Sequence, residues 1–340
     1  MLRVRFLLIL SLFLLLVSCR TEKDISISPP PFVEICSLDQ ACGALGVINS
    51  MDYVCDTAFV LCTNTQVYLY NFSGSLIRMI GRAGRANLEY SSPRVVRAGS
   101  DRIFVWDGML AKFVWFDENG QAEGECQFDR GVSDFIVNGD CLWIYSSNKE
   151  SKTCIVRLNY LSGESADQDF LQVEGGHHIL VRWMSRAPLC IRDGVVWSMS
   201  KNRLELCRSD SSEKLRIASS SFHEKEVSDP KAVINDRRKM EEYMCDTPFV
   251  VSILPGRESF LVLTAEGFLL KTEDGLDRSN RFYTIYSVLP SSGRSKALVS
   301  FPQESFSPDQ LMFGPDCFYC LAHRVEGNED MYYLEKIEIK

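Results

Sequence analysis

The sequence predicts an all-β fold, a six-bladed β-propeller that is closed by an N-terminal strand and carries one short helical insertion. Two observations lead to this prediction. Alternating strands and tight turns recur along the chain at intervals of about 40–65 residues, which is the range of propeller blades rather than of helical or leucine-rich solenoids. The last of these units lacks one strand, and an unused strand lies near the start of the chain.

The first residues have the pattern of a bacterial lipoprotein signal. Arg3 and Arg5 precede an apolar run that ends at Ser18 and Cys19. A run of this length falls short of the roughly 20 residues that a membrane-spanning helix needs. We therefore interpret residues 1–18 as a signal peptide and Cys19 as the lipid attachment residue.

Residues 19–31 are rich in charged residues, serine and proline, and we interpret them as a tether between the lipid and a propeller domain at 32–340. The whole chain has 37 Lys and Arg against 45 Asp and Glu. A protein that neutralises phosphates needs a basic surface. This acidic balance argues against nucleic acid as a partner.

The clearest blade lies between Ala58 and Ile80. The runs FVLCT, VYLYNFS and LIRMI alternate in the way that places successive side chains on opposite faces of a sheet. Turn-forming residues at Asn64 and Gly74 separate these runs, which predicts a three-strand meander.

Similar units follow, and each contains a dipeptide that supplies the positive φ of a tight hairpin. These turns are Ser73–Gly74, Asn119–Gly120, Ser162–Gly163, Ser211–Ser212 and Asp274–Gly275. The strands before them are Val67–Phe72, Lys112–Asp117, Cys154–Asn159, Arg203–Arg208 and Gly267–Thr272. These five pairs of strand and turn predict five blades.

The sixth unit has two strands, Cys317–Ala322 and Met331–Ile339, and no outer strand after them. Phe32–Leu38 alternates in the right way and precedes the first blade. We expect Phe32–Leu38 to pair with Met331–Ile339, because closure of the ring leaves no open sheet edge.

One helix is predicted, in an insertion at Glu224–Asp246. Asp229–Pro230 suits an N-cap and first turn, and Val233, Met240 and Met244 then fall on one stripe. This apolar stripe either covers the edge of the propeller itself or docks a partner.

Two stretches resemble a known family. IGRAG at 80–84 is followed by Glu89–Tyr90 and Pro93, and VWD at 105–107 is followed by FDENG at 116–120. Over about residues 32–130 the chain is similar to the six-bladed β-propeller lipoproteins of Bacteroidetes, relatives of the NHL and TolB-like propellers. The resemblance implies an exported protein of the cell envelope, held at the outer membrane by its lipid, and supplies no catalytic residues.

The motifs that suggest chemistry are weak. The glycines at 81 and 84 lack the third glycine and the helix of a nucleotide-binding loop. Cys317 and Cys320 would point to opposite faces of a strand. His177 and His178 have no acid at helical ligand spacing. We expect no metal and no cofactor.

Two classes of function remain. The first is a binding module for a protein, peptide or glycan, and the second is a hydrolase or lactonase with a metal in the propeller channel. The first strands of the blades decide between them, because a metal site needs several polar side chains there. These strands are Val47–Tyr53, Arg94–Ala98, Val132–Val137, Ala187–Ile191, Phe249–Leu254 and Asp309–Phe313. They are mostly apolar, with Asp52, Asp134 and Asp309 as the exceptions, which favours a binding protein that is not an enzyme.

Long loops with arginines and aromatic residues supply the candidate binding residues, because these residue types dominate binding hot spots. They are Arg82, Arg85, Tyr90, His177, His178 and Trp183.

Overall fold

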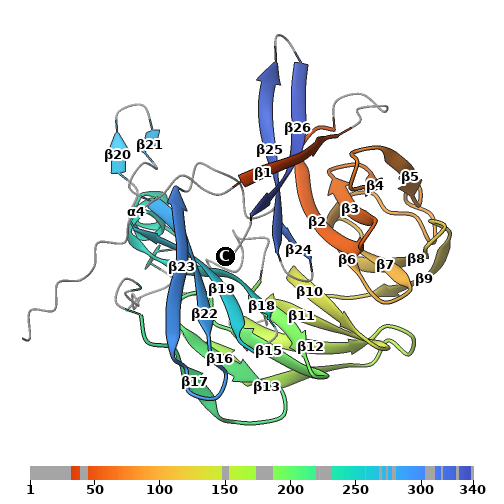
Figure 1. Ribbon diagram of the computed structural model, residues 1–340. Helices are drawn as coiled ribbons and strands as arrows, with labels where there is room; N and C mark the ends of the chain where they lie inside the picture. The colour runs from red at the N-terminus through yellow and green to blue at the C-terminus, as the bar shows by residue number, and fades with distance from the viewer. Residues whose placement is uncertain are drawn as a thin grey trace, which may run out of the picture.

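The alternating segments form strands that pair in chain order into four-stranded antiparallel sheets (Figure 1). The computed structural model describes residues 32–38, 45–147, 153–173, 187–219, 222, 232–233, 235–256, 258–267, 270–272, 275–277, 281–302, 311–314, 317–326 and 329–337. Within these residues, six four-stranded sheets stand as blades around a centre, and the predicted six-bladed propeller is confirmed.

Each blade runs from an inner strand at the channel to an outer strand at the rim. Blade 1 contains β2 (Ile48–Cys55), β3 (Ala58–Thr63), β4 (Val67–Asn71) and β5 (Leu76–Ile80). Blade 2 contains β6 (Pro93–Ala98), β7 (Arg102–Asp107), β8 (Lys112–Asp117) and β9 (Ala122–Gln127). Blade 3 contains β10 (Val132–Asn138), β11 (Cys141–Ser147), β12 (Thr153–Asn159) and β13 (Ser165–Val173). Blade 4 contains β14 (Leu189–Arg192), β15 (Val195–Met199), β16 (Glu205–Arg208) and β17 (Lys214–Arg216).

Blade 5 differs from the sequence prediction. It contains β18 (Phe249–Pro255), β19 (Phe260–Gly267), β22 (Arg281–Val288) and β23 (Ser295–Pro302). The segment predicted as its third strand instead forms a separate two-stranded hairpin of β20 (Leu270–Thr272) and β21 (Gly275–Asp277), which stands apart from the blade in Figure 1. The prediction was wrong because β22 offers β19 an eight-residue partner, whereas β20 has only three residues.

Blade 6 is completed by the start of the chain, as predicted. Its strands are β24 (Leu311–Phe313), β25 (Phe318–Glu326), β26 (Glu329–Ile337) and β1 (Phe32–Ser37). β1 pairs antiparallel with β26, with Phe32 opposite Ile337 and Ser37 opposite Tyr333. The N-terminal strand therefore joins the two ends of the ring.

The core is divided among the spaces between neighbouring blades. In β3, Phe59 and Leu61 pack toward blade 6, whereas Val60 and Cys62 pack toward blade 2. Because successive side chains of a strand point to opposite faces, every residue of β3 is buried. Each fully buried Phe or Leu side chain contributes about 1.5–3 kcal/mol. Six such clusters hold the described blades together.

Helix α4 (Arg237–Asp246) begins later than the predicted start of the insertion. Asp236 is its N-cap and accepts hydrogen bonds from the backbone N–H groups of Arg238 and Lys239 at 3.0 and 3.2 Å. Tyr243 is buried in the cluster between blades 5 and 6, and Val233 packs against the same cluster. These two residues thus cover the propeller. The predicted start at Asp229–Pro230, and the side chain of Met244, lie outside the described residues.

The connections at the two ends of the channel differ. Strands alternate in direction within a blade, so the turns after each first and third strand share one face, which we call the turn face. Gly74, Gly120 and Gly163 lie in these turns at φ values of 86°, 76° and 75°, as the dipeptides predict. The opposite face carries α4 and the β20–β21 hairpin.

The segments 1–18 and 19–31, with Cys19, lie outside the described residues. None of the helical segments that the structure describes has the length and hydropathy of a membrane-spanning helix.

Candidate functional site

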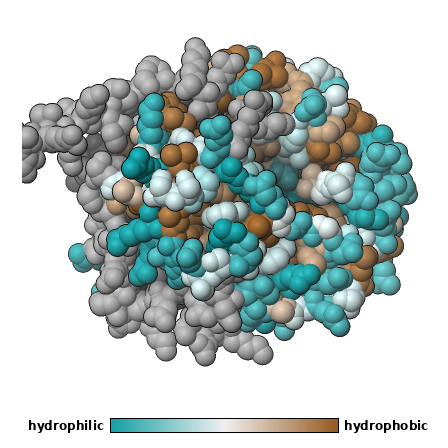
Figure 2. All heavy atoms as spheres, turned by 60° about the horizontal axis from the view of Figure 1, so that its bottom comes forward, coloured by the Kyte–Doolittle hydropathy of each residue, from teal (hydrophilic) through white to brown (hydrophobic). Residues whose placement is uncertain are grey.

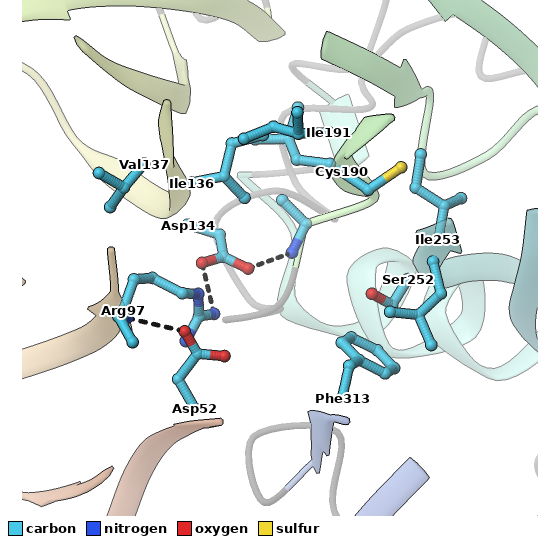
Figure 3. A pocket seen from close by; sticks show the side chains of 14 residues that line it. Asp52, Arg97, Asp134, Ile136, Val137, Cys190, Ile191, Ser252, Ile253 and Phe313 are labelled. Carbon is cyan, nitrogen blue, oxygen red and sulfur yellow. Dashed lines mark hydrogen bonds and ion pairs between the residues drawn. The ribbon is translucent and has the colours of Figure 1, made fainter. Parts of the chain in front are cut away.

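The inner strands enclose a pocket in the central channel (Figure 3). Its volume is about 210 Å³, and all six blades line it. Exposure rises toward the end of the inner strands: Arg97 is buried and Ala98 half-buried in β6, and Met312 is buried and Phe313 half-buried in β24. The pocket therefore opens toward the turn face.

A buried ion pair forms one side of the pocket. Nη2 of Arg97 in β6 pairs with Oδ1 of Asp134 in β10, and each side chain is 5% exposed. Nη1 of Arg97 donates to Ser50 Oγ at 2.8 Å and to the carbonyl of Val96 at 2.6 Å. The guanidinium is thus held by blades 1, 2 and 3 together.

Asp134 is fixed through both of its oxygens. Oδ1 accepts from the N–H of Phe135 at 2.8 Å as well as from Arg97, and Oδ2 accepts from the N–H of Ala187 at 2.9 Å. Ala187 comes just before the inner strand of blade 4. This carboxylate consequently ties blades 2, 3 and 4 around the channel.

Asp52 in β2 stands next to this ion pair. Its Oδ2 accepts from the N–H of Ala98 at 2.9 Å, which joins blades 1 and 2. The residue is half-buried at the pocket, whereas Asp134 is buried. Asp52 is therefore the more exposed of these two carboxylates.

The other side of the pocket is mostly apolar, with Ser252 as a polar residue beside Ile253 and Phe313. Ile136 and Ile191 continue the wall from blades 3 and 4, and Ile253 and Phe313 close it from blades 5 and 6. Figure 3 shows the Phe313 ring and Ile253 on the side away from Arg97. Cys190 also lines this wall, and burial raises the pKa of its thiol, so it lies there as an uncharged group.

Among the described residues that line the pocket, Asp52, Arg97 and Asp134 are the charged ones. Among the described residues, no group of three His, Cys, Asp or Glu side chains is placed to hold a metal ion. The arrangement suits recognition of a molecule that has both a polar and an apolar part.

The loop residues predicted for binding lie elsewhere. Arg82 is 83% exposed in its side chain and pairs with Glu89, and Arg85 is exposed with its guanidinium 3.9 Å from the sulfur of Met109. Tyr90 is fully buried; its hydroxyl donates to the Ile80 carbonyl at 2.5 Å. Tyr90 therefore packs blade 1 against blade 2 and presents no surface to a partner.

The remaining predicted residues, His177, His178 and Trp183, lie outside the described residues, as does Asp309. The sequence singled out Asp52 and Asp134 as polar residues in apolar inner strands, and the structure brings both to the pocket. It missed Arg97, which occupies the second-last position of β6. The available signal was that Arg97, like Asp52 and Asp134, is a charged residue within a mostly apolar inner strand.

The described face of the protein in Figure 2 carries brown residues in small groups among teal and white ones. Exposed large apolar side chains such as Met109 and Leu161 are spread over separate blades. Scattered apolar residues are normal for a protein surface. The channel pocket is thus a better-defined site than any apolar area on this face.

Two solved structures share this fold over nearly their whole length. A member of the DUF4221 family from Bacteroides vulgatus superposes with a TM-score of 0.65 at 9% identity, over 93% of this chain and 99% of that chain. A protein of Bacteroides fragilis, described as a candidate exported protein, superposes with a TM-score of 0.58 at 12% identity, over 91% and 96%. At these identities the likeness shows the fold alone. No protein-family model and no curated protein matches the sequence.

Proposed function

We propose that this protein is an exported, lipid-anchored binding module of the cell envelope that holds its ligand in the channel pocket and catalyses no reaction. The observation that carries the proposal is the pocket itself, in which a fixed polar side and an apolar side meet on six inner strands. Small-molecule sites in proteins combine apolar walls with a few oriented polar groups in this way. A protein or glycan partner is accommodated if it inserts one group into the pocket.

Binding explains the polar side better than catalysis does. Both oxygens of Asp134 accept hydrogen bonds from the protein, and Arg97 donates to Asp134 and to oxygens of blades 1 and 2. A general acid or base must exchange a proton with a substrate within hydrogen-bond reach. No histidine is found in the described lining of the pocket. The network instead holds the pocket wall rigid.

Export and lipid attachment rest on the first residues of the sequence. The run that ends at Ser18 and Cys19 has the order of a lipoprotein signal. The similar fold of a Bacteroides fragilis protein described as a candidate exported protein supports the same placement. We infer an outer-membrane lipoprotein. Its relation to the NHL and TolB-like propellers stays a prediction.

A pocket-filling variant tests the proposed site. Ala98 lines the pocket, so Ala98→Phe should fill it, whereas Ala166→Phe adds the same ring to an exposed position of β13. We expect small-molecule fragments to shift NMR signals of the wild type and of Ala166→Phe, and not of Ala98→Phe. Fragments that bind none of the three proteins, or all three alike, overturn the proposed site.

Catalysis is tested separately. The wild type should leave ester, lactone and glycoside substrates intact after chelation and after reloading with calcium or zinc. Metal-dependent turnover that Asp52→Asn abolishes would show that the protein is an enzyme. In that case the pocket remains the site, and the non-catalytic part of the proposal is wrong.

A further inference from the structure

We propose that two loops of blades 1 and 2, at 81–92 and 108–111, form a docking surface for an acidic segment of a partner protein. Arg85 and Arg94 receive carboxylates of this segment, and Met109 receives one of its apolar side chains. The inference is independent of the channel pocket, which opens toward the turn face.

The two loops lie on the face opposite the turn face. The loop at 81–92 follows β5, the last strand of blade 1, and the loop at 108–111 joins β7 to β8 in blade 2. Because strands alternate in direction within a blade, connections after a second or a fourth strand share this face. β6 begins at the same face, and Arg94 is its second residue.

Asp107 joins the two loops. Its Oδ1 accepts hydrogen bonds from the N–H groups of Met109 and Leu110 at 2.8 and 2.9 Å. Its Oδ2 accepts from the N–H groups of Ser91 and Ser92. This carboxylate is fully buried. The backbone of the surface is therefore set before a partner arrives, which lowers the entropy cost of association.

The outer part of the loop at 81–92 is fixed as well. Glu89 pairs with Arg82 and accepts from the N–H of Ala86 at 3.0 Å. Glu125 of β9 accepts from the N–H of Leu88 at 2.7 Å. Leu88 is held at a φ of 62°, which few residues other than glycine adopt, and its side chain is exposed. Backbone conformations of this kind cluster at binding positions.

Two arginines at these loops present their charge to solvent. Both side chains are exposed, and neither forms an ion pair within the described part of the chain. Nη2 of Arg85 lies 3.9 Å from Met109 Sδ. The stem of Arg94 lies against Gly108, where an added Cβ would come within 2.9 Å of Arg94 Cγ. Both arginines therefore stand beside the exposed turn at 108–109.

These groups suit carboxylates next to an apolar side chain. A guanidinium presents a planar set of N–H donors that matches both oxygens of a carboxylate. Met109 is 61% exposed, and its flexible thioether adapts to apolar groups of different shapes. Arginine and methionine are both enriched at protein interfaces.

An extended anionic surface fits less well than a short acidic segment. The chain has 45 Asp and Glu against 37 Lys and Arg, so a polyanion or an anionic membrane repels it at long range. A short segment meets chiefly the local charge of Arg85 and Arg94. Arginine clusters recognise acidic motifs of proteins in this way.

A peptide series tests the ligand class. Fluorescence anisotropy in 50 mM sodium chloride should show that fluorescein-labelled Gly-Glu-Glu-Leu-Glu-Glu-Gly-amide binds at least tenfold more tightly than the same peptide with glutamine in place of glutamate. Serine in place of leucine should weaken binding about threefold, because the contact with Met109 is lost. Raising the salt to 500 mM should weaken binding of the glutamate peptide severalfold, because salt screens charge attraction.

Substitutions locate the surface. Arg85→Ala and Arg94→Ala should each weaken binding of the glutamate peptide at least threefold, and the two combined at least tenfold. Arg294→Ala is the matched control, because it removes an exposed arginine from the turn between β22 and β23 on the turn face. It should leave the affinity unchanged, as should Ala98→Phe, which fills the channel pocket. Equal Tm values show that the variants fold.

Four results overturn the inference: no binding of the glutamate peptide, equal binding of the glutamine peptide, full affinity in the combined arginine variant, or loss of binding in Ala98→Phe. Vesicles of phosphatidylethanolamine and phosphatidylglycerol test the other source of negative charge. If they bind the wild type and not the combined variant, while the peptide binds neither, the arginines serve a lipid surface and the inference is wrong. If the peptide results hold and no fragment binds the pocket, the proposed pocket fails alone.

Discussion

Asp134→Asn should destabilise the propeller far more than a typical surface change. Asn keeps the shape of the side chain, but one carboxylate oxygen becomes an N–H donor. Both oxygens of Asp134 accept hydrogen bonds, from Arg97 and Phe135 on one side and from Ala187 on the other. Whichever way the amide turns, a buried donor loses its acceptor, and Arg97 loses its counter-charge.

The size of the effect follows from the burial of the pair. Removing one partner of a buried ion pair costs about 3–5 kcal/mol, because the other charge stays buried and uncompensated. With an unfolding entropy of about 2.1 cal/mol/K per residue over roughly 300 residues, this loss lowers Tm by about 5–8 °C. Scanning calorimetry at pH 7 measures it. The matched control is Asp101→Asn, whose side chain is 64% exposed and pairs with Arg102 at 2.8 Å; exposed pairs contribute about 0–1 kcal/mol.

A double substitution completes the test. Arg97→Met combined with Asp134→Asn leaves no unpaired guanidinium in the wall, so it should recover at least half of the stability that Asp134→Asn loses. A loss below about 1 kcal/mol in the single variant would refute the reasoning. So would a double variant whose loss equals the sum of the two single losses, because the residues would then not act as a pair.

Four further outcomes are expected. Cys19→Ala should release the protein from membranes; a variant that still sediments with membranes after an alkaline wash would argue against lipid attachment. Deletion of residues 32–37 should lower Tm and cause aggregation, because it uncovers β26, and unchanged melting and solubility would contradict closure by β1. Asp107→Ala should lower the unfolding free energy in urea by roughly 3 kcal/mol, since this fully buried carboxylate accepts from four backbone N–H groups; a loss under about 1 kcal/mol would oppose that role. Hydrogen bonds from Thr57 hold the pKa of the exposed Cys55 thiol below its usual value, so more of it is thiolate at neutral pH. Iodoacetamide should therefore label Cys55 before the other described cysteines in peptide mass spectra, and faster labelling of the buried Cys207 would count against this.

The fold was predictable because its signals are local. Alternation places the residues of β3 on two faces, and glycines such as Gly74 and Gly120 supply the positive φ of the blade turns. The same signals produced the error in blade 5. A hairpin at Asp274–Gly275 has the turn chemistry of a blade, and only the pairing of β19 with β22 shows that it lies outside the sheet. Turn residues such as Asp274–Gly275 therefore predict a hairpin, but they do not predict which strands lie beside it in a sheet.

Only part of the pocket could be predicted, because the contacts that form it join residues of different blades. Asp52 and Asp134 stand out in the sequence because they interrupt apolar strands. The role of Arg97 depends on Ser50 in one blade and Asp134 in another, and no pattern within β6 reveals that contact. Tyr90 shows the opposite error: an aromatic residue in a long loop suits a hot spot, yet its hydroxyl also suits the buried Ile80 carbonyl.

The pairing of β1 with β26 also constrains the order in which the molecule can be completed. The two strands are separated by nearly the whole chain. Contacts between residues so far apart in the sequence form late in folding, because bringing the strands together costs conformational entropy before their contacts stabilise the structure. β1 is synthesised before the other described strands, and it has no pairing partner until β26 has been synthesised. Until then blade 6 has an open edge and the core between blades 6 and 1 is unsealed. A chain that stops early therefore stays an open arc with an exposed strand edge, which makes it a substrate for chaperones and proteases rather than a less active propeller.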